Sequence, residues 1–312
     1  MKYICGFTFG FMSPRGSFES DQARESLRLM QEGTGSDTVI MTLAALQDTP
    51  HSVHVDYTGE HIVSDEELLL MIDYAKSLGM RIIIKPTVNV RNGTWRAHIN
   101  FFDHDVPCEP KWHEWFASYT EYQMHYARIA EQCGAEMLIV GCEMVQTERR
   151  AAEWRELIRQ VKTVYNGLVS YNTDKYQEEH VSWWDAVDVI SSSGYYPIDD
   201  WDRQLDRIEQ VVRKYNKPFF FAEAGCPSRK GSAMIPNNWE HGGEVDVDEQ
   251  ARFYQTMFDK VETRDWVEGF GMWDWKPDLY SKEEAHLNSD YCVYGKPAES
   301  IIYKEYTKHQ SK

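Results

Sequence analysis

Two glutamates stand directly behind apolar segments of the chain, where a carboxylate is unfavourable unless it is hydrogen-bonded or faces a solvated cleft. Glu143 follows the run Met137–Cys142, and Glu223 follows Pro218–Ala222. Either residue alone could instead cap the next helix or pair with an arginine. Two carboxyl groups about 5–5.5 Å apart on one sugar ring act as acid/base and nucleophile in retaining glycosidases. Unequal surroundings would keep one of them protonated and the other ionised. We therefore expect a pair of catalytic glutamates.

Other strand ends carry residues that suit a neutral, polyhydroxylated ring. Aromatic faces pack on the apolar C–H side of a sugar, and amide, lysine and arginine groups hydrogen-bond its hydroxyls. Trp273 and Trp275 are two residues apart at a strand end, so we expect both to project to the same side and at least one to stack on the sugar. The other candidates are Lys85, expected to end the third strand, Asn89, Trp95, Arg96, Asn172, Tyr195 and Tyr196.

A recurring pattern of helix, stop and apolar run predicts the elements that hold these residues. A glycine past a helix end is typical of a left-handed cap, and a short continuous apolar run is typical of a parallel strand buried on both faces. The predicted strands are Tyr3–Phe9, Thr38–Thr42, Met80–Lys85, Met137–Gly141, Leu168–Tyr171, Val187–Ser191, Phe219–Phe221 and Gly269–Trp273.

Helices are expected between these strands, one of them opened by a capping box of Ser64 and Glu67. Between the fifth and sixth strands we expect only a short or distorted helix within Lys175–Asp185. The predicted helices cover 18–33, 64–78, 111–133, 148–165, 199–215, 247–263 and 298–308.

Eight strand–helix units over 312 residues predict a (β/α)₈ TIM barrel, an α/β fold that forms one domain over residues 1–312. The alternative is a doubly wound sheet, which carries Gly-x-Gly-x-x-Gly after its first strand when it binds a dinucleotide. Here the corresponding segment, Gly6–Phe11, is aromatic where a phosphate-binding turn must be small. We therefore favour the barrel and expect no nucleotide or other cofactor.

Composition restricts the partner and the compartment. The 33 Lys and Arg face 50 Asp and Glu, a net charge of −17, which argues against nucleic acid and anionic membranes and favours a neutral partner. No apolar run approaches the roughly 20 residues of a membrane span, and no signal peptide is recognised. Neither the histidines nor the six cysteines have metal-site spacing, so no metal is expected. We expect a cytoplasmic protein, and its oligomeric state is left open.

Several motifs together resemble glycoside hydrolase family 113, β-1,4-mannan-degrading enzymes of the large retaining (β/α)₈ clan. The resemblance extends over nearly the whole chain in consistent order. The segments that carry it are Lys85-Pro86, Asn92–Arg96, Ile139–Met144, Glu153–Ile158, Val164–Gly167, Trp184–Asp188, Tyr195–Pro197 and Phe221–Gly225.

The resemblance implies that Glu143 is the acid/base and Glu223 the nucleophile. It also implies that one tyrosine after the sixth strand hydrogen-bonds the nucleophile, but it does not choose between Tyr195 and Tyr196. A tryptophan after the eighth strand would line the sugar cleft. The other cleft residues implied are Lys85, Asn89, Trp95, Arg96 and Asn172.

The chain departs from the clan pattern at three places. Cys142 stands where the clan usually has an asparagine that contacts the sugar 2-hydroxyl, and Thr87 stands where a histidine is expected. The segment Pro227–Glu244 is an insertion that is expected to narrow the cleft toward short oligosaccharides.

The leading hypothesis is a retaining β-1,4-mannanase or β-mannosidase-like enzyme that acts on manno-oligosaccharides, with endo or exo action left open. One alternative is another neutral β-glycan, such as a glucan, galactan or xylan, because Cys142 and Thr87 alter the expected sugar contacts. The other alternative is a non-catalytic sugar-binding barrel.

Overall fold

Eight parallel strands close into a barrel in the computed structural model, which describes residues 1–240 and 242–310. Neighbours in the barrel are also neighbours in the sequence, and β8 pairs with β1. The predicted TIM-barrel fold is therefore confirmed. The strands are β1 (Ile4–Phe9), β2 (Thr38–Gln47), β3 (Arg81–Val90), β4 (Met137–Cys142), β5 (Leu168–Thr173), β6 (Val189–Gly194), β7 (Phe219–Ala224) and β8 (Val267–Trp275).

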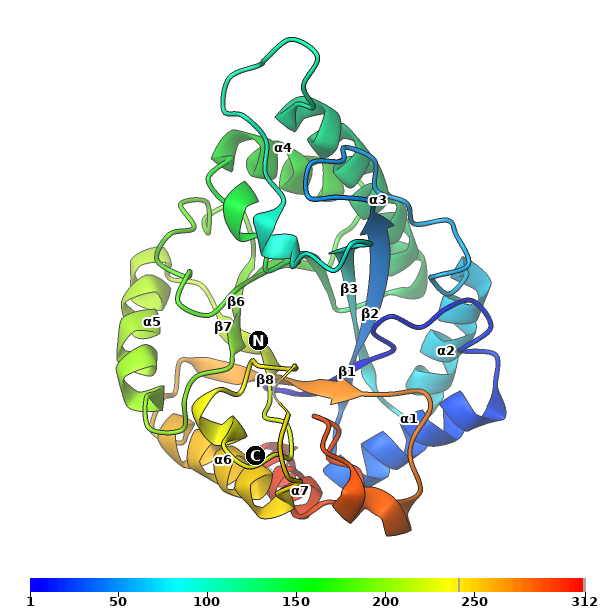
Figure 1. Cartoon of the computed structure of the whole chain (residues 1–312), viewed down its shortest axis with the longest axis vertical. Coiled ribbons are helices and arrows are strands. Elements are labelled where there is room, and N and C mark those ends of the chain that lie inside the picture. The colour runs from blue at the N-terminus through cyan, green and yellow to red at the C-terminus, as the bar shows by residue number, and fades with distance from the viewer. Residues whose placement is uncertain (241, 311–312) are drawn as a thin grey trace.

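Seven α-helices of the described residues form a ring outside the strands (Figure 1). The predicted capping box at Ser64 and Glu67 is present at the start of α2. The segment between β5 and β6 contains turns and no α-helix, and it buries Trp183 and Trp184. The helices are α1 (Asp21–Thr34), α2 (Asp65–Ser77), α3 (Trp112–Cys133), α4 (Ala151–Val161), α5 (Trp201–Tyr215), α6 (Val247–Val261) and α7 (Pro297–Gln310).

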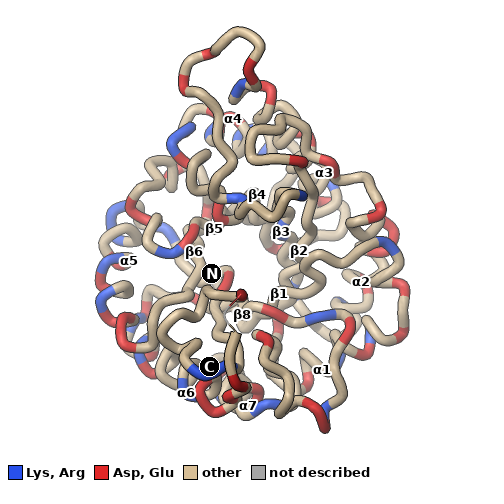
Figure 2. The backbone as a smooth tube through the Cα atoms, viewed as in Figure 1, with Lys and Arg blue, Asp and Glu red and all other residues tan. Residues whose placement is uncertain are grey.

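Both faces of the barrel wall are apolar, which explains the continuous apolar runs of the strands. A small cluster inside the barrel joins side chains from β1, β2, β3, β4, β6 and β7, among them Ile4, Ile83 and Phe220. A larger cluster packs the outer face of the strands against the helices. Charged residues of both signs are spread over the outer helices and loops (Figure 2). In the described part of the chain, no helix has the length and apolarity that a membrane crossing requires.

The strands β2 and β3 are longer than predicted, and this changes the position of Lys85. The prediction that Lys85 ends its strand was wrong, because β3 continues to Val90 and pairs with β2 as far as Gln47. Proline interrupts the apolar run at Pro86, which hid the second half of the strand. In the described chain β3 pairs with β4 only at Ile83 and Ile84, so beyond them it has a free side on which a proline is tolerated.

The two tryptophans of β8 point to different sides of the barrel wall, so the prediction that they share one side was wrong. Phe7 pairs with Met272 and Phe9 pairs with Trp275, so three steps along β8 match two along β1. Such a bulge breaks the alternation of side chains on which the prediction rested. Trp275 is buried against α1, where its Nε1 donates to Ser26. Trp273 faces the other side, toward the barrel mouth.

Gly141, two residues before Glu143, lies where the end of β4 is tightly packed against aromatic rings. A Cβ atom at this position would lie 2.8 Å from the ring of Tyr171 and 2.9 Å from that of Trp154, both fully buried. We expect Gly141→Ala to lower the free energy of unfolding by about 1–3 kcal/mol, because β4 must shift to make room. Activity should fall with it, since Glu143 moves with the strand. Urea unfolding and kcat measure the two effects, and an unchanged unfolding midpoint would contradict this packing.

Candidate active site

A cavity of about 950 Å³ opens at the mouth of the barrel, where the C-terminal ends of the strands meet. Both sequence-predicted glutamates line it, as do five of the nine other predicted site residues. The cavity wall includes Asn89, Trp95, Arg96, Glu143, Tyr195, Glu223 and Trp273 from the predicted set. Lys85, Asn172, Tyr196 and Trp275 are not in the wall, and each is placed below.

Glu143 follows the last residue of β4 in a backbone conformation with φ of 54°. This left-handed region is uncommon for a residue with a side chain, and it often marks a functional position. The backbone N–H of Glu143 donates to the Asn172 carbonyl at 2.8 Å, where the pairing of β4 with β5 shifts in register. The adjacent strand therefore holds the turn that directs this carboxylate into the cavity.

Three side chains donate to the Glu143 carboxylate from three directions. Arg96 Nη1 lies 3.1 Å and Trp95 Nε1 lies 3.3 Å from Oε2. The Ser193 hydroxyl donates to Oε1 at 2.8 Å. Arg96 is itself held by Asn89, whose Oδ1 accepts from Nη2 at 2.7 Å. The orientation of Glu143 is thus defined by the loop after β3 on one side and by β6 on the other.

Glu223 lies within β7, next to its end, and also accepts from three side chains. Lys85 Nζ is 2.5 Å from Oε1, and the Cys142 thiol donates to the same oxygen at 3.2 Å. The Tyr195 hydroxyl donates to Oε2 at 2.9 Å. This contact answers the question that the sequence left open, since Tyr195 and not Tyr196 touches Glu223.

Charge decides the protonation state of Glu223. Burial alone would raise the pKa of this carboxyl group, but the charge and hydrogen bond of Lys85 and the charge of Arg96 outweigh burial and hold the pKa below its ordinary value. Burial would likewise lower the pKa of Lys85, yet the surrounding negative groups raise it above its ordinary value. Glu223 is therefore an ionised carboxylate beside an ammonium ion, which suits a nucleophile.

Lys85 and Asn172 lie beneath the cavity and join the two glutamates there. Both side chains are fully buried. Lys85 Nζ donates to Asn172 Oδ1 at 3.4 Å, and Asn172 Nδ2 donates to the Ser193 hydroxyl at 3.0 Å. Ser193 in turn donates to Glu143, so a chain of hydrogen bonds runs from Glu223 to Glu143 under the floor of the site. The expectation that Lys85 and Asn172 line the cleft is corrected, because their polar atoms are used within this chain.

Two further predicted residues lie outside the cavity. Tyr196 is fully buried, and its hydroxyl donates to Glu178 at 2.5 Å behind the barrel wall. It follows Tyr195 directly, and consecutive extended residues point to opposite sides. Trp275 packs against α1, as described above. Thr87, where a histidine is expected, is also buried, and its hydroxyl donates to the Leu43 carbonyl at 3.3 Å.

Several cavity residues were not predicted from the sequence. Asp174 lies two positions after Asn172, so the position of the strand end could have identified it. Burial and then the charge of Glu143 raise the pKa of Asp174 to about 8, against the opposing charge of Lys175. Ser193, which lies in β6 and hydrogen-bonds Glu143, was not predicted either. From the insertion, Arg229, Asn237 and Trp239 reach the wall, together with Asp274 from β8 and with Phe11 and Asp290 from other loops.

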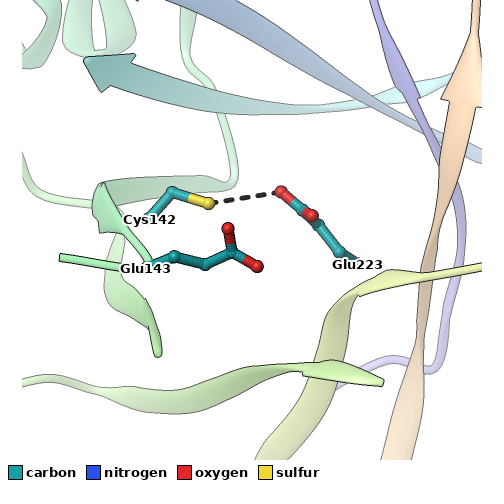
Figure 3. Close-up of side chains that lie close together, drawn as sticks. All are labelled: Cys142, Glu143 and Glu223. Carbon is teal, nitrogen blue, oxygen red and sulfur yellow. Dashed lines mark hydrogen bonds between the residues drawn. The ribbon is translucent and has the colours of Figure 1, made fainter. Parts of the chain in front are cut away.

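Cys142, Glu143 and Glu223 each place one potential metal-ligand atom within 4.8 Å of the others, and Figure 3 shows the three side chains turned toward one another. Spacing in the sequence predicted no metal here. Each carboxylate already binds a cation, Glu223 to Lys85 and Glu143 to Arg96. A divalent ion would have to displace or tolerate both positive charges, so this set of donors fits a metal poorly.

Comparison with known proteins places this geometry in a family. A model described as Glycoside Hydrolase Family 113 matches residues 7–296. The chain is similar to a solved complex of a family 113 β-1,4-mannanase, with 62% identity, a TM-score of 0.98, and 98% of this chain and 99% of that chain covered. It is also similar to a family 113 β-mannanase from Alicyclobacillus acidocaldarius, solved in complex with ManMIm. There the identity is 42%, the TM-score 0.96 and the coverage 99% of this chain and 98% of that chain.

A more distant similarity concerns the fold alone. A β-D-glucuronidase from Dictyoglomus thermophilum is 14% identical with a TM-score of 0.66, and the match covers 98% of this chain and 51% of that chain. Among the curated proteins, no match to the chain was found.

The ammonium group of Lys85 should set the acid limb of the pH profile. Replacing Lys85 by methionine removes the positive charge that lowers the pKa of Glu223, so this pKa should rise and the carboxylate should protonate at higher pH. The acid limb of kcat/KM for glycoside hydrolysis, which reports the free enzyme, should move upward by the same amount.

A surface lysine provides the matched control for this experiment. Lys162 pairs with Asp188 on the outside of the barrel, and Lys162→Met should leave the acid limb in place. An acid limb that is unmoved in Lys85→Met would show that Lys85 does not control the ionisation of Glu223.

Proposed function

The chain belongs to glycoside hydrolase family 113, and we propose that it is a retaining β-1,4-mannanase that hydrolyses manno-oligosaccharides. Glu223 is the nucleophile and Glu143 the acid/base in this proposal. The observation that carries it is the spacing of the two side chains, whose nearest carboxylate oxygens lie within 4.8 Å of each other. Retaining enzymes hold these groups about 5–5.5 Å apart, whereas inverting enzymes leave about 6.5–9.5 Å for a water molecule.

The surroundings of the two glutamates support different roles in a double displacement. Glu223 attacks the anomeric carbon while Glu143 gives a proton to the departing glycosidic oxygen. Glu143 then takes a proton from water, whose oxygen attacks the same carbon and releases Glu223. Lys85 and Tyr195 hold the nucleophile as an oriented anion, and Trp95, Arg96 and Ser193 hold the acid/base in place. The two steps restore the starting protonation of both carboxyl groups.

Mannan-derived sugars are the substrate class that we propose, because the most similar solved structures listed above are described as β-1,4-mannanases. The cavity also suits a neutral ring, since it combines the faces of Trp95 and Trp273 with amide and guanidinium donors. We keep another neutral β-glycan as a second candidate on one observation. The Cys142 thiol donates a hydrogen bond to Glu223. Cys142 stands at the position where the clan usually has an asparagine whose amide contacts the sugar 2-hydroxyl.

We also propose that the enzyme works in a reducing compartment such as the cytoplasm. All six cysteines are free thiols, and five of them are buried. Detection of the enzyme in the cytoplasmic fraction of a cell extract would test this proposal.

Glu223→Gln removes the nucleophile while keeping the shape of the side chain. We expect kcat/KM for mannotetraose to fall by at least about 10⁴-fold, because the amide cannot form the glycosyl ester. Glu156→Gln on the exposed face of α4 is the matched control and should retain full activity. Near-normal hydrolysis by Glu223→Gln would refute the assignment. In the same assay, a wild-type preference for glucan, galactan or xylan oligosaccharides over mannotetraose would favour the second candidate.

A further inference from the structure

Asp274 is a buried acidic residue in the cavity wall that the reaction described above does not use. It follows Trp273 in β8 and is 7% exposed. Its Oδ1 atom has no hydrogen-bond donor among the residues that the structure describes. A buried polar atom that lacks a partner costs about 1–3 kcal/mol, and more when it carries charge. A carboxyl group with such an atom beside a ligand cavity can accept a hydrogen bond from the ligand once the group turns toward it.

The neighbouring charges do not satisfy Asp274. The closest basic residue in the sequence, Lys276, forms its ion pair with Asp290, on the same wall of the cavity. Asp290 also accepts from the backbone N–H of Tyr291 at 2.8 Å. The Lys276–Asp290 pair is therefore complete without Asp274.

Ionisation of Asp274 is unfavourable in this environment. Burial, followed by the charges of Asp290 and Glu223, raises the pKa of Asp274 to about 7, although the charge of Lys276 opposes them. Near neutral pH the carboxyl group is thus present in both forms. The neutral acid can donate one hydrogen bond and accept another, as a sugar hydroxyl also does.

The position of Asp274 identifies the part of the substrate that it meets. Trp273, the residue before it, presents its ring to the same cavity, and Lys85 Nζ lies 5.7 Å from the centre of that ring. Lys85 also binds Glu223, so the Trp273 ring lies beside the nucleophile. A sugar stacked on Trp273 is therefore the one that Glu223 attacks, and its hydroxyls extend from the edge of the ring toward the residues around the tryptophan.

We propose that Asp274 is a specificity-determining residue that hydrogen-bonds a hydroxyl group of the sugar attacked by Glu223. The inference rests on the proposed function, because it requires the cavity to bind a β-linked sugar for hydrolysis. The terminal carboxyl torsion of aspartate is broad, so either oxygen can turn toward the hydroxyl. A neutral sugar hydroxyl satisfies the buried acceptor, whereas a sugar that carries a carboxylate at this edge would be repelled by Asp274 and Asp290.

A purely structural explanation exists and gives a different result. The hydroxyl of Tyr254 is also buried without a partner among the described residues, and its pKa is raised by burial and, among other charges, by that of Asp274. A buried water between Tyr254 and Asp274 would satisfy both groups without any sugar. In that case substitution of Asp274 would change stability but not the recognition of individual hydroxyls.

Deoxygenated substrates separate the two explanations. In a β-1,4 chain the attacked mannose has free hydroxyls at positions 2, 3 and 6, and the 2-position also changes the reactivity of the anomeric carbon. We would measure kcat/KM for an aryl β-mannobioside and for its analogues that lack the 3- or the 6-hydroxyl on the attacked mannose. For wild type, kcat/KM should be about 10–100-fold lower on at least one analogue than on the parent substrate. This factor corresponds to the loss of one hydrogen bond to a charged or strongly polar group.

Asp274→Ala should lower kcat/KM for the parent substrate by a similar factor. This variant should then cleave the parent substrate and the analogue disfavoured by wild type with similar kcat/KM. Asp274→Leu, which is close to aspartate in shape but cannot hydrogen-bond a hydroxyl, provides the same comparison if the alanine variant does not fold. Asp278→Asn is the matched control, because Asp278 lies on the same connection but its carboxylate accepts from Gln22 on the surface, outside the cavity. This control variant should show the same ratio of kcat/KM between the parent substrate and each analogue as wild type does.

The outcomes distinguish failure of this inference from failure of the proposed function. If wild type cleaves the parent substrate and folded Asp274 variants retain its full discrimination, only the role of Asp274 is overturned. If wild type discriminates against neither analogue, the role is overturned as well. If wild type cleaves no mannoside, the proposed function fails and the inference fails with it.

Discussion

Two carboxylates buried at one barrel mouth require two cations beside them, and the rest of the site depends on this balance. Removing an ion from water costs on the order of several kcal/mol even in a relaxed protein, unless a partner of opposite charge and further hydrogen bonds replace the water. Lys85 supplies that charge to Glu223 and Arg96 supplies it to Glu143. Without Lys85, the Glu223 carboxylate would lose the main charge that keeps it ionised, and it could not act as a nucleophile.

This balance explains features of the barrel that are otherwise unrelated. The long strand β3 carries Lys85 in its middle, deep enough to reach β7, and the loop after it returns Arg96 to β4. The chain through Asn172 and Ser193 connects the two ion pairs with neutral donors and acceptors. The two glutamates also differ in setting, since Glu223 lies within β7 while Glu143 follows β4 with a left-handed backbone that β5 holds. One carboxylate is thus fixed as an anion, and the other is directed at the leaving group by a neutral hydroxyl, an indole and a guanidinium.

Much of this arrangement could be predicted from the sequence, and the predictions that failed did so for identifiable physical reasons. The barrel and both glutamates follow from apolar runs and their ends, because burial on two faces leaves a clear pattern. The length of β3 did not follow, since a run interrupted by Pro86 gives no sign that β2 continues to pair with it. The prediction that Trp275 points to the same side as Trp273 was wrong. The bulge that turns Trp275 away arises from the pairing of β8 with β1, which the sequence of β8 alone does not reveal. Asp274 and Ser193 were missed because their importance comes from what surrounds them in space, and no short motif records that.

The central claim is that Glu223 forms a covalent bond with the substrate, and trapping that intermediate tests it most directly. A 2-deoxy-2-fluoro-β-mannosyl fluoride should glycosylate the enzyme faster than water releases the sugar, because the fluorine destabilises the second transition state while the good leaving group speeds the first. Peptide mapping by mass spectrometry should then find one sugar attached, on the peptide that contains Glu223. A label on Glu143 or any other residue, or hydrolysis of the reagent with no label at any time, would contradict the account.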